Sequence, residues 1–169
     1  CKEKLQKEYR KNRANEVIDY IKASTYVKRR EEPPNLIPLK NGILDLDKME
    51  LKPHSPEYMF FNKLPVKYDP NAKCPNIDKF HREITGSKED VQILEEVIGF
   101  CLYRKYFIAM ALMLVGEGSN GKSTWLNLVK TFLGFENVSS RSLQELEENR
   151  FAKADLHHKL ANIYADLPD

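Results

Sequence analysis

A glycine-rich stretch, GEGSNGKSTW at residues 116–125, carries the residue types and the spacing of a phosphate-binding loop. It matches the pattern G-x-x-x-x-G-K-[ST], and the matching residues are Gly116, Gly121, Lys122 and Ser123. Glycines allow successive backbone N–H groups to point into one concavity, and a helix that follows adds the positive end of its dipole. The stretch therefore predicts a loop that holds phosphate oxygens.

Two side chains of this loop are predicted to act directly. The ammonium of Lys122 would reach the β- and γ-phosphates of a nucleotide, and the hydroxyl of Ser123 is an oxygen ligand of the kind that Mg²⁺ prefers. The backbone supplies the other contacts, so the side chains of Glu117 and Asn120 are expected to be free. The predicted nucleotide-binding residues are Gly116, Glu117, Gly118, Ser119, Asn120, Gly121, Lys122, Ser123 and Thr124. A glycine turn before a core helix, with an incidental Lys-Ser pair, is the alternative interpretation.

An acidic residue for the metal ion is expected at the end of a neighbouring buried strand, and the segment LANIYAD ends in Asp166. Lys122 and Asp166 are therefore the predicted catalytic residues, and Ser123 and Asp166 are the predicted metal ligands. A turn aspartate before Leu-Pro is the alternative. In many ATPases a second acidic residue comes next and orients the attacking water. Leu167 stands at that position, so the catalytic base stays open.

The elements that position these residues follow from apolar periodicity. Residues 107–115 form an apolar run that ends in glycine, which predicts a fully buried parallel strand in front of the loop. An apolar stripe at helical spacing predicts a helix behind the loop, with Gly134 at its end. An edge strand, a helix from Ser142 to about Phe151 and a short buried strand over residues 160–165 complete the predicted order.

The region before the apolar run predicts a small module of mixed α and β structure. It begins with a helix over residues 2–22, which a charge run and two prolines bring to an end. Asn41-Gly42 predicts the tight turn of a β-hairpin. Asn76 is the predicted cap of a short helix, and Ser87 opens a longer one.

Composition and charge exclude several classes of protein. Of the 169 residues, 41% are hydrophobic and 31% are charged, which is typical of a globular protein, and the net charge of +2 does not indicate a polyanion partner. The three cysteines are widely separated, so neither a disulfide framework nor a zinc site is expected. The longest apolar run is too short to span a bilayer, and no secretory signal is present. We expect a cytoplasmic protein with reduced thiols, and a segment of a larger chain.

Several stretches together resemble the superfamily 3 helicase region of phage, plasmid and large-virus primase-helicases, including the poxvirus type. They are KNGILDL, LPVKYDP, EEVIGFCL, LVGEGSNGKSTWLNLVKTFLG and RFAKADLHHKLANIYADLPD, and the resemblance spans residues 36–169. It implies the α/β fold class, with a truncated P-loop parallel-sheet ATPase core of the AAA+ type after a small α+β N-terminal module. The implied domains are residues 1–88 for the module, 89–106 for a connecting helix and 107–169 for the first half of the ATPase.

The resemblance also implies an ATP-dependent replicative DNA helicase that uses Mg²⁺, translocates on single-stranded DNA and unwinds duplex. The implied partners are single-stranded or forked DNA, identical subunits in a homo-hexamer and a primase domain on the same chain, with no membrane. The sensor residue and the arginine that completes a neighbour's site would lie beyond Asp169, so the segment would be incomplete for catalysis. Two alternatives stay open: another P-loop phosphotransferase, or a module over residues 1–105 that recruits a primase or origin protein and uses ATP for ring assembly.

Overall fold

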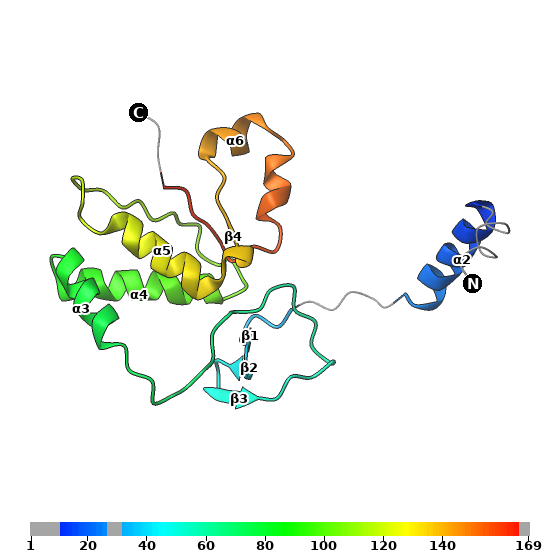
Figure 1. The fold of residues 1–169 in the computed structure, drawn as a ribbon, viewed down its shortest axis with the longest axis horizontal. Coiled ribbons are helices and arrows are strands. Elements are labelled where there is room, and N and C mark those ends of the chain that lie inside the picture. The colour runs from blue at the N-terminus through cyan, green and yellow to red at the C-terminus, as the bar shows by residue number, and fades with distance from the viewer. Residues whose placement is uncertain (1–10, 27–31, 166–169) are drawn as a thin grey trace, which may run out of the picture. The chain divides into compact units, whose positions relative to one another are not determined.

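The computed structural model describes residues 11–26 and 32–165 (Figure 1). The chain divides into two compact units, residues 1–31 and residues 32–169. The second unit carries the whole of the predicted phosphate-binding loop.

The described part of the first unit contains the helix α2 (Lys11–Ser24). None of its side chains is buried, and the apolar Val17, Ile18 and Ile21 are each about half exposed. The helix predicted over residues 2–22 is confirmed from Lys11 onward, and its first half lies outside the described residues.

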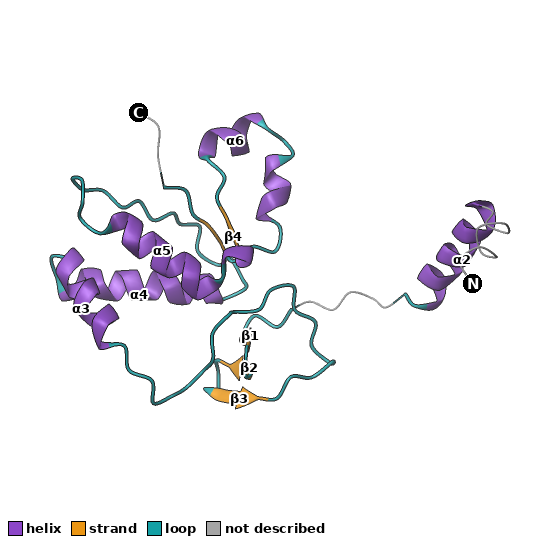
Figure 2. Ribbon diagram, in the orientation of Figure 1, coloured by secondary structure: helices purple, strands orange, loops and turns teal. Residues whose placement is uncertain are grey.

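A three-stranded antiparallel sheet opens the second unit (Figure 2). Its strands, in the order β1-β2-β3, are β1 (Leu36–Leu39), β2 (Gly42–Asp45) and β3 (Glu50–Lys52). The first two strands are buried along their whole length, and the side chains of Ile37 and Ile43 are fully buried. The predicted hairpin is therefore confirmed.

The turn of this hairpin lies one residue earlier than predicted. Leu39 pairs with Gly42, so the turn ends at Asn41 and Gly42 begins the second strand. The side chain of Asn41 binds the backbone of Tyr68, accepting from its N–H at 3.0 Å and donating to its carbonyl at 2.8 Å. Glycine is required at position 42 because a Cβ there would lie 2.4 Å from the carbonyl oxygen of Lys52.

Asp45 fixes the turn between β2 and β3. Its carboxylate accepts from the ammonium of Lys52 at 2.6 Å and from the N–H groups of Asp47 and Lys48 at 3.1 and 3.3 Å. The bond from Lys52 holds the pKa of Asp45 below its ordinary value and raises the pKa of Lys52. A side chain of the second strand thus sets the path of the chain into the third.

Helices and short strands make up the rest of this unit. Ser87 caps one helix as predicted, and Ser142 and Glu145 form the predicted capping box of another. A third helix begins after Cys74, with a proline in its first turn, so the predicted cap Asn76 lies inside it. The elements are α3 (Pro75–Ile84), α4 (Lys88–Leu102), α5 (Lys122–Leu133), the 3-10 helix η1 (Phe135–Asn137), β4 (Val138–Ser139), α6 (Leu143–Glu148), the 3-10 helix η2 (Ala152–Leu156) and β5 (Ala161–Asn162).

The prediction of a buried strand over residues 107–115 is wrong. The segment has no regular secondary structure and pairs with no strand of the described residues. Phe107, Met113 and Val115 are 64%, 65% and 84% exposed. A parallel strand is held by hydrogen bonds to neighbouring strands, and the described residues supply none here. The unit is therefore mixed α/β, as predicted, but its described residues do not form a parallel-sheet ATPase core.

The strands β4 and β5 pair in parallel, with Ser139 opposite Asn162. The buried strand predicted over residues 160–165 is thus shorter than expected, and none of these residues is buried. Ile163 still donates its N–H to the carbonyl of Ser139 at 2.8 Å. The predicted order of helix, edge strand, helix and strand after the loop is confirmed by α5, β4, α6 and β5.

Residues 62–66, an irregular segment, link the sheet to later parts of the chain. The N–H of Leu64 donates to the carbonyl of Pro38 in β1 at 2.9 Å. The amide of Asn137 donates to the carbonyl of the segment's second residue at 2.9 Å. The side-chain amide of Asn62, the first residue of the segment, donates to the carbonyl of His158 at 3.1 Å. These last two bonds join positions that are 74 and 96 residues apart.

The hydrophobic core joins the sheet to α4 and α5. Most of its members are leucines, which reach it from β1, β2, residues 62–66 and the two helices. The buried cluster consists of Ile37, Leu39, Leu44, Leu64, Leu94, Trp125, Val129 and Leu133. The helix behind the predicted loop is therefore anchored through its buried face.

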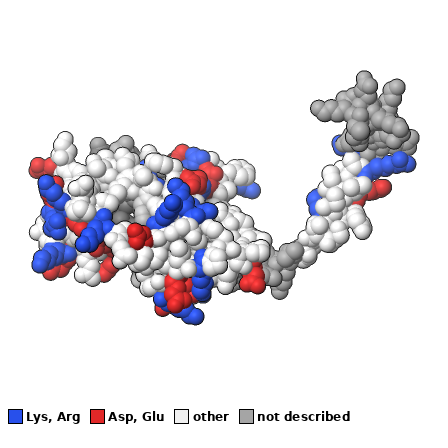
Figure 3. All heavy atoms as spheres, turned by 60° about the horizontal axis from the view of Figure 1, so that its bottom comes forward, with Lys and Arg blue, Asp and Glu red and all other residues white. Residues whose placement is uncertain are grey.

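Basic and acidic side chains are interspersed on the face seen in Figure 3, in line with the small net charge. Across residues 11–26 and 32–165, no helix has both the length and the apolar character that crossing a membrane requires.

Candidate phosphate-binding site

The predicted phosphate-binding loop lies at the N-terminal end of α5 (Lys122–Leu133). Ser119 and Gly121 have left-handed φ values of 59° and 86°, and Gly121 is the N-cap of the helix. At the other end Gly134, with φ 89°, donates its N–H to the carbonyl of Lys130 at 2.9 Å. The predicted helix and its glycine terminus are therefore confirmed.

The ammonium of Lys122 lies inside the loop. Its Nζ donates to the carbonyl oxygens of Gly116 and Glu117 at 2.7 and 2.8 Å. A third bond goes to Oδ1 of Asn120 at 2.8 Å. An ammonium group has three N–H donors, so all of them are used. The loop thus closes around the cation that the sequence predicts to bind phosphate.

The backbone of the loop keeps its donors available. Residues 118–119 form a hydrogen-bonded turn, but the N–H groups of residues 122–124 donate to no atom of the described residues. The N–H of Trp125 donates to the carbonyl of Gly121 at 2.9 Å. Free N–H groups at a helix N-terminus suit phosphate oxygens, and the helix dipole favours their charge. A Cβ at Gly116 would lie 2.3 Å from Nδ2 of Asn120, so the start of the loop has no room for a side chain.

The predicted metal ligands are placed only in part. Ser123 and Thr124 are exposed in the first turn of α5, and their hydroxyls make no hydrogen bond with the described residues. Asp166, the predicted catalytic acid and metal ligand, lies outside the described residues. Within the part of the chain that is described, no group of three or more His, Cys, Asp or Glu side chains could hold a metal ion.

The helix α3 packs against the end of the loop. A Cβ on Gly121 would lie 2.5 Å from Cγ2 of Ile84 and 3.4 Å from Cε2 of Phe80. The first of these distances is shorter than real carbon atoms tolerate. Gly121 also has a φ of 86°, which glycine adopts without steric cost. This position therefore requires glycine for two independent reasons.

Replacing Gly121 with alanine is expected to lower the free energy of unfolding by roughly 2–5 kcal/mol. A left-handed φ costs alanine about 1–2 kcal/mol, and overpacking against Ile84 adds about 1–3 kcal/mol. Urea denaturation followed by circular dichroism measures the loss. Gly99→Ala is the matched control, because a Cβ there meets no atom within 4 Å and alanine favours the helix. An unchanged midpoint for Gly121→Ala would contradict the contact with α3.

The side chain of Asn120, which is predicted to be free, is engaged on both sides. Its Oδ1 accepts from Lys122, and its Nδ2 lies against Gly116. The side chain of Glu117 makes no hydrogen bond or ion pair with the described residues, in line with the prediction. The sequence gives no signal for this bond, because the left-handed φ of 59° falls on Ser119, whereas Asn is the residue type that tolerates this conformation.

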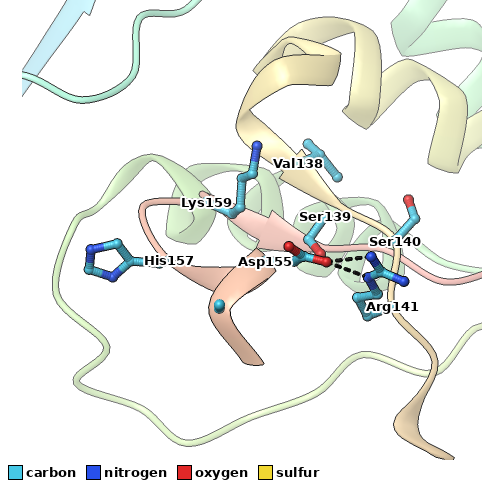
Figure 4. A pocket seen from close by; sticks show the side chains of 8 residues that line it. Val138, Ser139, Ser140, Arg141, Asp155, His157 and Lys159 are labelled. Carbon is cyan, nitrogen blue, oxygen red and sulfur yellow. Dashed lines mark hydrogen bonds and ion pairs between the residues drawn. The ribbon is translucent and has the colours of Figure 1, made fainter. Parts of the chain in front are cut away.

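A separate pocket of about 500 Å³ lies between β4 and η2, and none of its lining residues belongs to the loop (Figure 4). On its wall Arg141 donates to Asp155 at 2.7 Å and lies 3.3 Å from Glu145. Asp155 raises the pKa of Arg141, so the guanidinium stays charged and is already paired with a carboxylate. Lys159 and His157 point away from the Arg141–Asp155 pair (Figure 4). The loop is therefore the better candidate for binding phosphate.

Two families match the chain, each over one part of it. Residues 1–86 match the family described as D5 N terminal like, and residues 114–169 match a family of unknown function (DUF5906). The first match extends just past α3, and the second includes the loop, α5 and β5. The contact of Ile84 with Gly121 therefore joins the two matched parts.

Proposed function

The chain belongs to the D5 N terminal like family, which is typical of primase-helicases in DNA replication, and from this premise we propose that it forms the ATP-binding part of a replicative DNA helicase. In this proposal residues 116–124 are the Walker A motif of a superfamily 3 helicase. Residues 1–88 are its N-terminal module, residues 89–106 connect the two parts, and residues 107–169 begin the ATPase domain. The whole protein would hydrolyse ATP, move along single-stranded DNA as a homo-hexamer and unwind the duplex.

The observation that supports this proposal is the combination of one cation with a row of free donors at the start of α5. The ammonium of Lys122 lies within the loop, and the N–H groups of residues 122–124 have no acceptor among the described residues. A triphosphate carries several negative oxygens in a row, and it would supply acceptors for both. Gly116 and Gly121 leave no room for a Cβ, so the path of the loop around this cation requires glycine at both positions.

Each residue has a proposed part in hydrolysis. Lys122 would bind oxygens of the β- and γ-phosphates and stabilise the negative charge that develops on them. The hydroxyl of Ser123 is exposed beside Lys122 and fits the oxygen preference of Mg²⁺, and with the carboxylate of Asp166 it would hold that ion. Bound Mg²⁺ neutralises charge on the phosphates. Water would attack the γ-phosphorus in line, the bond to the β-phosphate oxygen would break, and ADP and inorganic phosphate would leave. An arginine from a neighbouring subunit would complete the site.

Calorimetric titration of the chain with ATP tests the binding step. Saturable binding of ATP, with none of adenosine, would support recognition through the phosphates, whereas no binding of ATP would overturn the proposal. The helicase step is tested by ATP hydrolysis in a longer protein that carries this segment, with and without single-stranded DNA. Stimulation by DNA supports a translocating motor. Transfer of phosphate to a metabolite without DNA would favour a phosphotransferase instead.

A recruiting module is the second candidate function, and the helix α2 favours it. Val17, Ile18 and Ile21 lie near one another on this helix, and each is about half exposed. An apolar helix face of this kind is typical of a surface that binds a partner. Capture of a primase or an origin protein by the whole chain, retained after deletion of residues 116–124, would favour recruitment over ATP-driven unwinding.

A further inference from the structure

Asn120 is distinct among the three acceptors that hold Lys122. The other two acceptors are backbone carbonyls, those of Gly116 and Glu117, at 2.7 and 2.8 Å from Nζ. Asn120 provides a side-chain acceptor at 2.8 Å, and the residue is exposed. The amide is placed by its close approach to Gly116, where a Cβ would lie 2.3 Å from Nδ2.

A phosphate oxygen and the amide oxygen of Asn120 would compete for the same donor. All three N–H groups of the Lys122 ammonium are used in the described structure, so a phosphate binds it only if one of the three bonds is given up. The two carbonyls are fixed by the backbone. The amide turns about its own side-chain torsions, so Asn120 is the acceptor that yields at least cost.

We propose that Asn120 is a positioning residue that holds the ammonium of Lys122 while the loop is free of nucleotide and releases it when phosphate binds. This inference rests on the proposed function, because it concerns the same loop. A bond that is present only in the free state lowers the affinity for the ligand, since the ligand must replace it. A neutral amide suits this part, because a carboxylate would hold the ammonium more strongly and would repel the phosphates.

The test compares Asn120→Ala with Asn120→Asp in calorimetric titrations of the whole chain with ATP. Asn120→Ala removes the competing acceptor, so ATP should bind about three- to tenfold more tightly, which is the worth of one exposed hydrogen bond. Asn120→Asp strengthens the competitor and adds a negative charge, so ATP should bind at least about tenfold more weakly. A merely structural role for Asn120 would weaken binding in both variants, and the sign of the first effect separates the two cases.

Asn127 supplies the matched controls, because it is exposed on the same helix and its side chain makes no hydrogen bond with the described residues. Asn127→Ala and Asn127→Asp make the same changes in size and charge away from the ammonium. Both should leave the affinity for ATP nearly unchanged. A loss in Asn127→Asp as large as that in Asn120→Asp would assign the effect to net charge and overturn the inference.

The reactivity of Lys122 gives a readout that needs no nucleotide. Acetic anhydride acetylates an amine faster when the amine is less engaged in hydrogen bonds, and mass spectrometry reports the extent at Lys122 beside Lys130 as an internal reference. Asn120→Ala should raise the rate at Lys122 relative to Lys130. An unchanged ratio would show that Asn120 does not hold the ammonium in solution and would overturn the inference.

The outcomes of these titrations also separate this inference from the proposed function. Tighter binding of ATP by Asn120→Ala, together with weaker binding by Asn120→Asp, supports the inference. Weaker or unchanged binding by Asn120→Ala overturns the inference and leaves the proposed function in place. Failure of the unaltered chain to bind ATP overturns both.

Discussion

Lys122→Ala should weaken ATP binding by about 100-fold. In the proposed complex the N–H that Asn120 releases makes a charge-assisted hydrogen bond to the phosphates, and a bond of this class is worth about 1.5–3 kcal/mol. One such bond at the upper value gives about 3 kcal/mol, and a factor of ten corresponds to about 1.4 kcal/mol. Calorimetric titration with ATP measures the change directly.

Lys130→Ala is the matched control for this experiment, because it removes the same charge from the last turn of the same helix. Its affinity for ATP should stay close to that of the unaltered chain. Equal losses in the two variants would mean that net charge attracts the nucleotide, and they would contradict a specific contact between Lys122 and phosphate.

Leu133→Ala should lower the free energy of unfolding of the second unit by roughly 2–5 kcal/mol. The side chain of Leu133 is 0% exposed and belongs to the core cluster, together with Leu94 of α4 and Leu64. Truncation removes apolar area from the core and leaves a cavity that the surrounding side chains fill only in part. Urea denaturation followed by circular dichroism measures the loss.

Leu143→Ala makes the same substitution on an exposed residue, because Leu143 is 66% exposed on α6. The free energy of unfolding should change by no more than about 0.5 kcal/mol. A loss in Leu143→Ala that equals the loss in Leu133→Ala would locate the effect outside the core and would contradict the role given to Leu133.

Features set by short-range interactions could be predicted from the sequence. Ser87 and Ser142 cap their helices by accepting from an N–H three residues ahead, so the whole signal lies in a few adjacent letters. Gly134 ends α5 for the same reason, since its N–H reaches the carbonyl of Lys130. The order of elements after the loop follows from these local starts and stops.

Features that depend on distant partners were predicted less well. The apolar run over residues 107–115 has the composition of a buried strand, but a strand also needs neighbours, and composition does not supply them. Asn41 is a residue type that is typical of turns, but its side chain donates a hydrogen bond to the backbone carbonyl of Tyr68, which lies 27 residues further along the chain. In the loop, the motif predicts the helix behind it but not the contact of Gly121 with Ile84. The role of Asp166 stays a prediction.

The bonds of residues 62–66 set an order in which the chain must fold during synthesis. The bond to β1 becomes possible as soon as the segment leaves the ribosome. The bonds with Asn137 and His158 must wait until partners 74 and 96 positions away are made. At about 5–20 residues per second, synthesis of these partners takes on the order of 4–19 seconds. A protein cut between residues 86 and 114, at the edges of the two family matches, would leave both pieces without these partners. The two families therefore meet inside one unit of folding.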